Sequence, residues 1–482
     1  MSADHYKAEA KRLAAHLVDT HGIKLKHASV LEAIAALHGA RDWNTLLASG
    51  QPGLVRRVAT ALLPKGKTSF QPVRRYEDFL YCEPCPTTFL GTDFDCTRAV
   101  ELTNQNLRNH ILVLGQQGQG ASQLMVSLAL QQIARSGGLL FIDPLGAPDT
   151  QAALAQAMAQ AQRTDFQALS EAPGSDRYDL FEGDSDHVVD RLLCLLPAQE
   201  SEPVRLRALL LAVIVAQVTA FQPRTVQALH RVLTNPQELL KLRDAVSDLG
   251  EIRDMLQAAL LDVLRRTKDG ERIDLAAYRD LVGDFPERLS AFWQSDAGKV
   301  LGEGSQCVKM RQVFARSGVV YLGLPAMADQ SAVAILANML RLDLQNATRV
   351  FTPPQALLQV APFMLMVSHV GAVADRRWAA LPNWARMLGL VMVLHDTSVE
   401  DLQRTGDRFT EAVLYNTANK VFFQAGSPRA HAAALGLLQA CGGSNVNGSD
   451  WSHRLASLVR GRALYLREGA VQDLLCGVVT LS

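Results

Sequence analysis

A short apolar strand, a glycine-rich loop and an amphipathic helix follow one another near residue 115, and this succession most constrains the fold. The strand is Ile111–Leu114, the loop reads Gly-Gln-Gln-Gly-Gln-Gly-Ala-Ser over 115–122, and the helix carries Leu124, Leu128 and Ile133 on one face. Glycines in such a loop let backbone N–H groups surround phosphate oxygens. The pattern predicts an α/β core built around a phosphate-binding loop.

The loop lacks its usual cation. In the common form of this loop, a lysine and then a Ser or Thr follow the last glycine, and the lysine reaches the β and γ phosphate oxygens. Here Gly115, Gly118, Gly120 and Ser122 keep the frame, but Ala121 stands where the lysine belongs. We therefore expect a loop with the shape of a nucleotide site but without the side chain that holds the phosphates.

Composition is that of a soluble globular protein with a large core. The 482 residues are 48% hydrophobic, which suggests two to four domains. The longest apolar run, Ala208–Ala216, is interrupted by Gln217 and falls short of the roughly 20 residues that span a bilayer. No signal peptide is recognisable at the N-terminus, and the odd number of seven cysteines favours reduced thiols. We expect a cytoplasmic protein.

Charge is unevenly distributed along the chain. Residues 1–75 hold 12 Lys/Arg and 5 Asp/Glu, a net charge of +7, while the whole chain has a net charge of zero. A basic segment can bind the phosphate backbone of DNA or an acidic protein surface. Because these charges are dispersed, they also fit a solvated helical face, and both interpretations stay open.

Five segments are expected from the pattern. They are an N-terminal helical module at 1–50, a linker with short strands at 51–100, the first part of the core at 101–185, an all-α insertion at 186–300, and the second part of the core at 301–482. The insertion has Leu, Val and Ile at three- and four-residue intervals and no convincing strand.

The core strands are expected on both sides of the insertion. Leu139–Ile142 follows the loop and helix, which makes a βαβ unit and implies a parallel sheet. Later apolar runs predict strands at Val319–Leu324, Phe363–Val367, Leu390–Leu394 and Val421–Gln424. The tail, Ala463–Leu466 followed by Val471–Leu481, predicts a terminal hairpin.

One cysteine pair has a spacing associated with metal or redox chemistry. Cys82 and Cys85 enclose Glu-Pro, but no second Cys-x-x-Cys accompanies them. A lone pair is weak evidence for zinc or disulfide chemistry. Two ordinary thiols beside a turn at Pro84 are the simpler interpretation.

This order of motifs resembles the coupling ATPases of type IV secretion and conjugation, a branch of the ring-forming DNA-translocase superfamily. The likeness covers about residues 90–480 and rests on Asn109–Gly115, Gly138–Pro144, Gly318–Leu324 and Gly461–Arg467. The family usually has a lysine after its Asp-Pro, where this chain has Leu145. The resemblance implies a RecA-like P-loop NTPase core with a parallel central sheet, interrupted by an all-α domain.

The N-terminal segment has a separate resemblance. Residues 10–47 are similar to a small helical domain that is related in name to glyoxalases and recurs on proteins of conjugative elements. No glyoxalase metal ligands are recognisable here, so we interpret the segment as a docking module.

In the coupling family, a second strand ends in Asp-Glu, where the Asp positions Mg²⁺ and the Glu polarises the attacking water. The matching strand here ends in Ser368 and His369, which supply no fixed anion for a cation that prefers oxygen ligands. A glutamine that senses the γ-phosphate normally follows the next strand, and Thr397 stands in its place. The resemblance therefore implies a degenerate site, a pseudo-ATPase with no required cofactor.

The same strand ends offer residues for two other kinds of site. His369, His395 and Asp396 could share one edge of the sheet as a transition-metal site. Ser368, His369 and Asp396 could form a hydrolase triad, although no Gly-x-Ser-x-Gly elbow is present there. Histidines at strand ends are more often simply hydrogen-bonded, and we expect no metal.

The resemblance implies a scaffold or recruiting adaptor in a secretion or conjugation system. Its partners would be an active coupling ATPase, a relaxase or other substrate protein, and DNA through the basic N-terminal region. Association with the membrane would occur only through these partners. Both homo-oligomers and hetero-oligomers stay open. Two alternatives remain. The first is a divergent but active DNA-translocating ATPase in which another cation replaces the missing lysine, although Arg108 is poorly placed for that role. The second is a regulator that binds ATP and Mg²⁺ weakly without hydrolysis.

Overall fold

The computed structural model describes residues 73–75, 87–198, 203–248, 250–267, 270–303, 307–325, 329–350, 361–441 and 448–481. The N-terminal module and the Cys82/Cys85 pair lie outside these residues. The chain divides into two compact units, the first made of Met1–Phe70 with Thr92–Ala99 and the second of Gln71–Gly91 with Val100–Ser482.

The described part of the first unit is a turn organised by Asp93. One oxygen of its carboxylate accepts hydrogen bonds from the N–H groups of Thr97 at 2.7 Å and Arg98 at 3.1 Å. The backbone N–H of Asp93 donates to the Arg98 carbonyl at 3.0 Å. A short polar side chain thus satisfies the turn's backbone donors.

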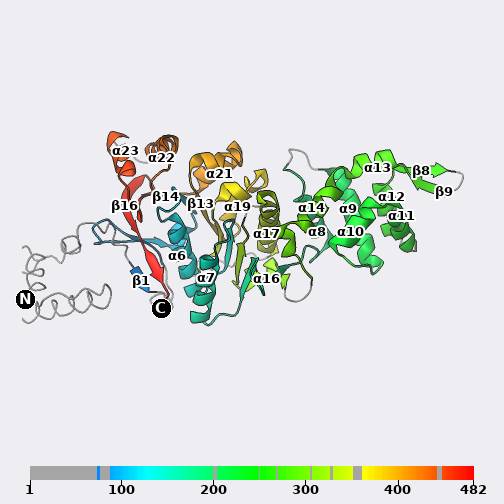
Figure 1. The fold of residues 1–482 in the computed structure, drawn as a ribbon, viewed down its shortest axis with the longest axis horizontal. Coiled ribbons are helices and arrows are strands. Elements are labelled where there is room, and N and C mark those ends of the chain that lie inside the picture. The colour runs from blue at the N-terminus through cyan, green and yellow to red at the C-terminus, as the bar shows by residue number, and fades with distance from the viewer. Residues whose placement is uncertain are drawn as a thin grey trace, which may run out of the picture. The chain divides into compact units, whose positions relative to one another are not determined.

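A large mixed sheet forms the centre of the second unit (Figure 1). In spatial order its strands are β3 (Ala99–Thr103), β2 (Thr87–Thr92), β16 (Ala470–Cys476), β15 (Arg462–Arg467), β14 (Asn419–Phe422), β4 (Ile111–Leu114), β13 (Leu390–Asp396), β12 (Phe363–Val367), β5 (Leu139–Asp143), β11 (Val319–Gly323) and β6 (Phe166–Ser170). From β14 to β6 all neighbours are parallel. The predicted α/β fold with a parallel central sheet is confirmed.

The central strands of this sheet, such as β4, β13 and β12, are covered on both faces, which explains why they are almost continuously apolar. In β4, Ile111 and Val113 belong to a core cluster that also includes residues of α6 (Ala121–Ala134) and α7 (Pro148–Gln160). Leu112 and Leu114 alternate with them and are also buried. The remaining helices around the sheet are α5 (Asn104–Leu107), α17 (Gln330–Val350), α18 (Val370–Val373), η2 (Arg376–Trp378), α19 (Leu381–Ala385), α20 (Val399–Gln403), α21 (Asp407–Asn416), α22 (Pro428–Cys441) and α23 (Gly448–Ala456).

The predicted terminal hairpin is present and continues into a third strand. β15 and β16 pair antiparallel, and β15 also pairs antiparallel with β14. The chain then turns at Gly477 into β17 (Val478–Thr480), which pairs parallel with β1 (Val73–Arg75). Across the described ranges, no helix combines the length and apolarity needed to cross a membrane.

Helices dominate between β6 and β11. They are α8 (Ser185–Leu193), α9 (Val204–Thr219), α10 (Val226–Thr234), α11 (Pro236–Ala245), α12 (Gly250–Ala259), α13 (Leu275–Val282), α14 (Phe285–Gln294), α15 (Asp296–Lys299) and α16 (Met310–Ala315). Local signals set their starts: the Thr225 hydroxyl accepts the N–H of Ala228 before α10, and Asn235 caps α11 with Pro236 at its first turn.

The prediction that 186–300 contains no strand is wrong. β8 (Leu264–Thr267) and β9 (Gly270–Ile273) form an antiparallel pair inside it. These strands are mostly exposed and contain Arg265, Arg266, Glu271 and Arg272, so they carry no apolar signal. A second short pair, β7 (Arg177–Tyr178) with β10 (Cys307–Val308), was also not predicted.

Candidate functional site

The phosphate-binding loop has the backbone conformation that its glycines allow. Gly118 and Gly120 have positive φ values of 85° and 114°, which non-glycine residues rarely adopt. Gly120 precedes α6 and offers no side-chain cap to it. The first N–H groups of α6 therefore lack the partner that a capping side chain supplies, which is the arrangement that binds anions at helix N-termini.

The loop is held between the ends of neighbouring strands. The N–H of Gly115 donates to the Asp396 carbonyl at 3.2 Å, and the N–H of Gln116 donates to the Gln424 carbonyl at 3.0 Å. A Cβ atom on Gly115 would lie only 2.4 Å from the Cβ of Phe423, so a glycine is required there. The hollow beside the loop has a volume of about 10 Å³, which is room for about one water molecule.

Ala121, at the lysine position, is the first residue of α6. It is only 4% exposed, whereas the neighbouring Ser122 is exposed. The structure therefore places an apolar methyl group and a free hydroxyl at the helix start. Neither can supply the positive charge that the loop has lost.

The two altered strand-end motifs come together at the carboxyl edge of the sheet. Ser368 and His369 follow β12, and His395 lies near the end of the adjacent β13. The Ser368 Oγ lies 2.9 Å from Nδ1 of His369 and 3.4 Å from Nδ1 of His395. The two imidazole rings are perpendicular, with centroids 4.8 Å apart.

Burial keeps both histidines neutral. It lowers the pKa of His395 from 6.5 to about 3 and lowers the pKa of His369 as well. Where the structure describes the chain, no group of three His, Cys, Asp or Glu side chains is placed to hold a metal ion. Where the resemblance to coupling ATPases implies a Mg²⁺ anchor and a base, this chain presents a hydroxyl between two neutral rings.

Asp396 serves the backbone rather than either histidine. Its carboxylate accepts the N–H of Gly371 at 2.7 Å and the N–H of Thr397 at 2.8 Å. Burial raises the pKa of Asp396 to about 6. Since the carboxylate is used in this way and Ser368 is buried, the alternative hydrolase triad of Ser368, His369 and Asp396 is not formed.

Thr397, where the resemblance implies a sensor glutamine, is bound to Asp401 beside the start of α20, which Ser398 caps. Its hydroxyl donates to the Asp401 carboxylate, and the Ser398 hydroxyl donates to the same oxygen at 2.9 Å. The N–H of Asp401 donates back to the Ser398 Oγ at 3.2 Å. The Ser398-x-x-Asp401 spacing is a capping signal that sequence reasoning missed.

A cavity of about 470 Å³ lies at this edge and is lined by Leu145, His369, Asp396, Asp401 and Arg404 among others. Asp401 and Arg404 also form an ion pair at 3.3 Å. The volume is within the range of ligand sites. Its carboxylates already accept hydrogen bonds from the protein, and the cavity walls provide a single cation, so the lining does not match the charge of a nucleoside triphosphate.

Asp143 is the last residue of β5 and the first of the Asp-Pro pair, and its side chain binds groups of the protein. Its carboxylate accepts the N–H of Leu145 at 3.1 Å and the Tyr321 hydroxyl at 3.0 Å. It therefore organises the turn into α7. Leu145, which follows the Asp-Pro pair, is 40% exposed.

Acidification tests the neutral histidine pair. A buried histidine with a pKa of about 3 contributes stability that is complete above pH 6.5 and is lost as the pH falls from 6.5 toward 3, because only the unfolded chain takes up the proton. Wild type should therefore lose stability on acidification from pH 7 to pH 5, and His395→Asn should lose about 2 kcal/mol less over the same interval. The free energy of unfolding is measured by denaturant unfolding at both pH values.

The control for this measurement is Asp396→Asn. The raised pKa of Asp396 acts in the opposite direction between about pH 4 and pH 6, since there the folded state binds the extra proton. Asp396→Asn should thus lose more stability than wild type on acidification. Equal pH slopes in all three proteins would contradict this account of the site.

Comparisons with known proteins address the two parts of the chain separately. A family described as "Glyoxalase superfamily protein" matches residues 1–65, which lie before the described residues. No curated protein sequence matches the chain. Among solved structures, the bacterial conjugative coupling protein TrwBΔN70 in complex with sulphate aligns with a TM-score of 0.57 and 13% identity, covering 85% of this chain and 96% of that one.

Two further structures of the same coupling protein give similar values. TrwB with the non-hydrolysable GTP analogue GDPNP aligns with a TM-score of 0.56 and 13% identity over 85% of this chain and 90% of that one. TrwB with ADP and Mg²⁺ aligns with a TM-score of 0.54 and 12% identity over 86% and 91%. At these identities the likeness concerns the fold, and the chain has the RecA-like P-loop fold seen in TrwB.

Proposed function

We propose that this protein is a pseudo-ATPase that uses the fold of a coupling motor as a scaffold or recruiting adaptor in a type IV secretion or conjugation system. The proposal depends on the side chains found at the carboxyl ends of β4, β13 and β12. The loop keeps its glycine backbone there, while Ala121 supplies no cation and Ser368 and His369 supply no anion.

Phosphoryl transfer requires a phosphate-binding backbone and an anchor for Mg²⁺, and these residues fit the first requirement but not the second. The uncapped start of α6 and the positive-φ glycines fit a phosphate group. A neutral hydroxyl and imidazole do not fit the fixed oxygen anion that Mg²⁺ prefers. Because catalysis of this reaction depends on positioning and electrostatic stabilisation, loss of the lysine, the metal anchor and the base removes both.

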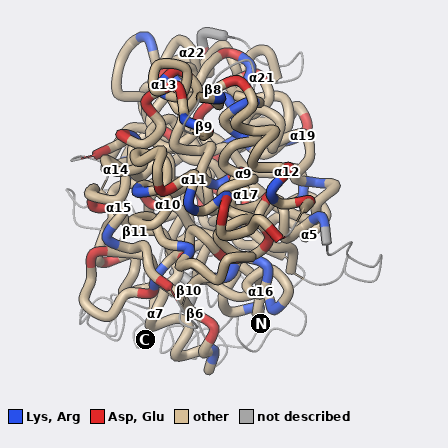
Figure 2. Tube along the Cα trace, turned by 90° about the vertical axis from the view of Figure 1, so that its right-hand side faces the viewer, with Lys and Arg blue, Asp and Glu red and all other residues tan. Residues whose placement is uncertain are grey.

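Protein partners fit the helical segment between β6 and β11 (α8 to α16) better than DNA does. Lys/Arg and Asp/Glu are interspersed over α9 to α15 in Figure 2, rather than gathered into one basic face. DNA binding depends on several phosphate contacts from clustered cations. We assign protein recognition to this segment and leave DNA contact to the basic residues of 1–75.

ATP turnover is the decisive test of the pseudo-enzyme. Purified full-length protein should show background hydrolysis with and without DNA, and Ser122→Glu, which blocks the start of α6, should not change that background. Hydrolysis that DNA stimulates and Ser122→Glu abolishes would end the proposal in favour of an active translocase. Affinity capture from the native host should separately recover a coupling ATPase or relaxase.

A further inference from the structure

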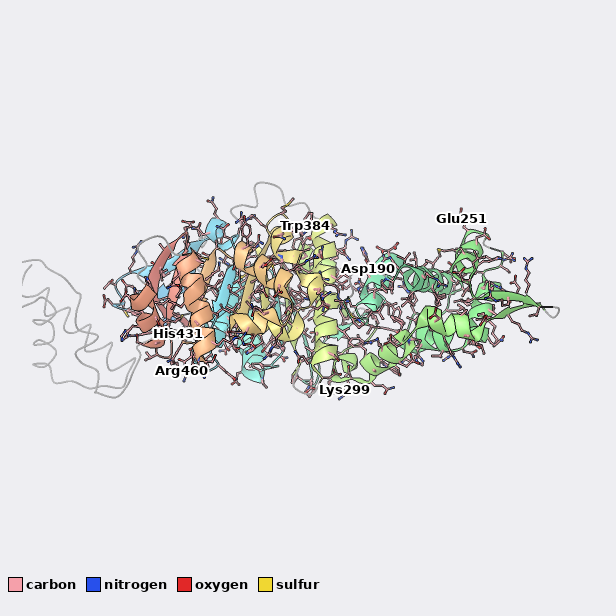
Figure 3. The ribbon with its side chains drawn as sticks, turned by 90° about the horizontal axis from the view of Figure 1, so that it is seen from above. Asp190, Glu251, Lys299, Trp384, His431 and Arg460 are labelled. Atoms are coloured by element: carbon pink, nitrogen blue, oxygen red, sulfur yellow. The ribbon has the colours of Figure 1, made fainter. Side chains whose placement is uncertain are left out.

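A second polar cavity lies away from the phosphate-binding loop, between the end of α8, the start of α9 and the face of α17. Its volume is about 410 Å³. Arg341, Gln345 and Arg349 are spaced four residues apart on α17 and therefore share one helix face. With Cys194, Arg207 and Arg377 they line this cavity, which we call the arginine cavity. Asp190, labelled in Figure 3, lies on its wall.

Arg341 is the buried cation of the arginine cavity. Its side chain is 5% exposed, and its guanidinium lies 5.9 Å from the centroid of the Trp378 ring. One nitrogen, Nη1, donates to the Gln345 Oε1 at 3.0 Å. Its Nε is buried without a hydrogen-bond partner, and no described carboxylate forms an ion pair with Arg341.

The nearby acidic groups are committed to other arginines. Asp375 binds Arg377, with its carboxylate oxygen 2.9 Å from the Arg377 Nε. Asp190 binds Arg207 at 2.5 Å. Burial raises the pKa of the Cys194 thiol to about 11, so this neighbour does not become a thiolate counter-ion at neutral pH.

Among the described residues, the unmatched groups at this site are donors. Besides the Arg341 Nε, the Nδ2 of Asn346 is buried without a partner, and Arg349 adds an exposed guanidinium for which no ion pair is seen in the described part. A buried charge without a partner costs several kcal/mol, so such groups are normally paired. The complement to a set of unmatched donors around a guanidinium is a group rich in acceptor oxygens.

We propose that the arginine cavity binds a small organic oxyanion, whose phosphate or carboxylate group is held by the guanidinium of Arg341. Guanidinium matches the paired oxygens of both groups. The cavity volume lies in the range of small-molecule sites and exceeds what a bare ion needs. The ligand would sit where α8 meets α17, at a distance along the chain from every motif of the phosphate loop.

Thermal melting with defined probes tests this site. Inorganic phosphate and citrate, each compared with chloride at equal ionic strength, should raise the melting temperature of the full-length protein in a saturable way, because ligands of the native state stabilise it. The probe that raises the melting temperature more shows whether the cavity prefers a phosphate or a carboxylate group. Ser122→Glu should keep the response, since it blocks only the phosphate loop.

Arg341→Met is the matched variant. It removes the charge at similar length, so the apparent affinity for the anion should fall about 10- to 100-fold. In chloride alone the variant should melt no lower than wild type, because it removes an uncompensated charge. Arg341→Lys should restore part of the anion response.

Three results would overturn the proposal. The first is a wild-type melting temperature that phosphate and citrate do not change relative to chloride. The second is a change in melting temperature that Ser122→Glu abolishes and Arg341→Met retains. The third is a melting temperature of Arg341→Met in chloride clearly below that of wild type. The last result would mean that the protein itself compensates the charge.

Discussion

Replacing Asp343 with alanine is expected to lower the free energy of unfolding by about 3–5 kcal/mol, the cost of breaking a buried ion pair. Asp343 lies on α17, and its carboxylate binds the Arg191 Nε of α8 at 2.7 Å and the Tyr178 hydroxyl of β7 at 2.7 Å. The Arg191 and Asp343 side chains are 7% and 9% exposed. Without Asp343, the buried Arg191 guanidinium keeps the Leu180 and Glu182 carbonyls as its hydrogen-bond partners among the described residues.

The same contact joins the helical segment to the core, so its loss should also loosen that junction. Denaturant unfolding of Asp343→Ala measures the effect, and Asp284→Ala is the matched control because Asp284 forms an exposed pair with Arg288. Exposed pairs contribute about 0–1 kcal/mol. Equal costs for the two variants would show that the buried pair contributes no more than a surface pair.

Sequence patterns predicted the core strands well because these strands are buried on both faces. Continuous apolar runs such as Phe363–Val367 and Leu390–Leu394 stand out from their surroundings, and both are strands, paired with each other in parallel. The chain order of strand, glycine loop, helix and strand then restricted the topology. Fold class followed from these two facts.

Elements with little burial gave no such signal. β8 and β9 contain three arginines and a glutamate and no fully buried residue, so hydrophobic periodicity could not separate them from the surrounding helices. β7 and β10 each have only two residues and pair across more than a hundred positions of chain. Their formation depends on tertiary contacts that no local pattern records.

The sequence predicted which residues meet at the candidate site, but it did not predict the hydrogen bonds that they form. Adjacent strand ends brought Ser368 and His369 near His395, as the parallel pairing of β12 and β13 requires. That Asp396 would bind the Gly371 N–H, and that Asp401 would receive the Thr397 hydroxyl, depends on how α18 and α20 pack. The arginine cavity likewise combines residues from α8, α9 and α17 and has no linear motif.

Restoring the missing cation should separate nucleotide binding from hydrolysis. Ala121→Lys places an ammonium at the first residue of α6, beside the positive-φ glycines Gly118 and Gly120. One charge-assisted hydrogen bond contributes about 1.5–3 kcal/mol, so we expect ATP affinity to rise about 10- to 100-fold, measured by calorimetry or by a nucleotide-dependent melting shift. Ala121→Met, similar in length and uncharged, should leave affinity unchanged.

Hydrolysis should nevertheless remain at background in Ala121→Lys. Ser368 stays between two neutral imidazoles and Thr397 stays bound to Asp401, so neither a Mg²⁺ anchor nor a base is restored. Tight binding without turnover would show that the loop kept its backbone cradle while the second strand lost its chemistry. If turnover appeared with the lysine alone, the substituted strand ends would not prevent hydrolysis, and the proposal of a pseudo-ATPase would fail. Catalytic residues would then have to be sought elsewhere along the carboxyl edge, first at Asp401 and Arg404, which line its cavity.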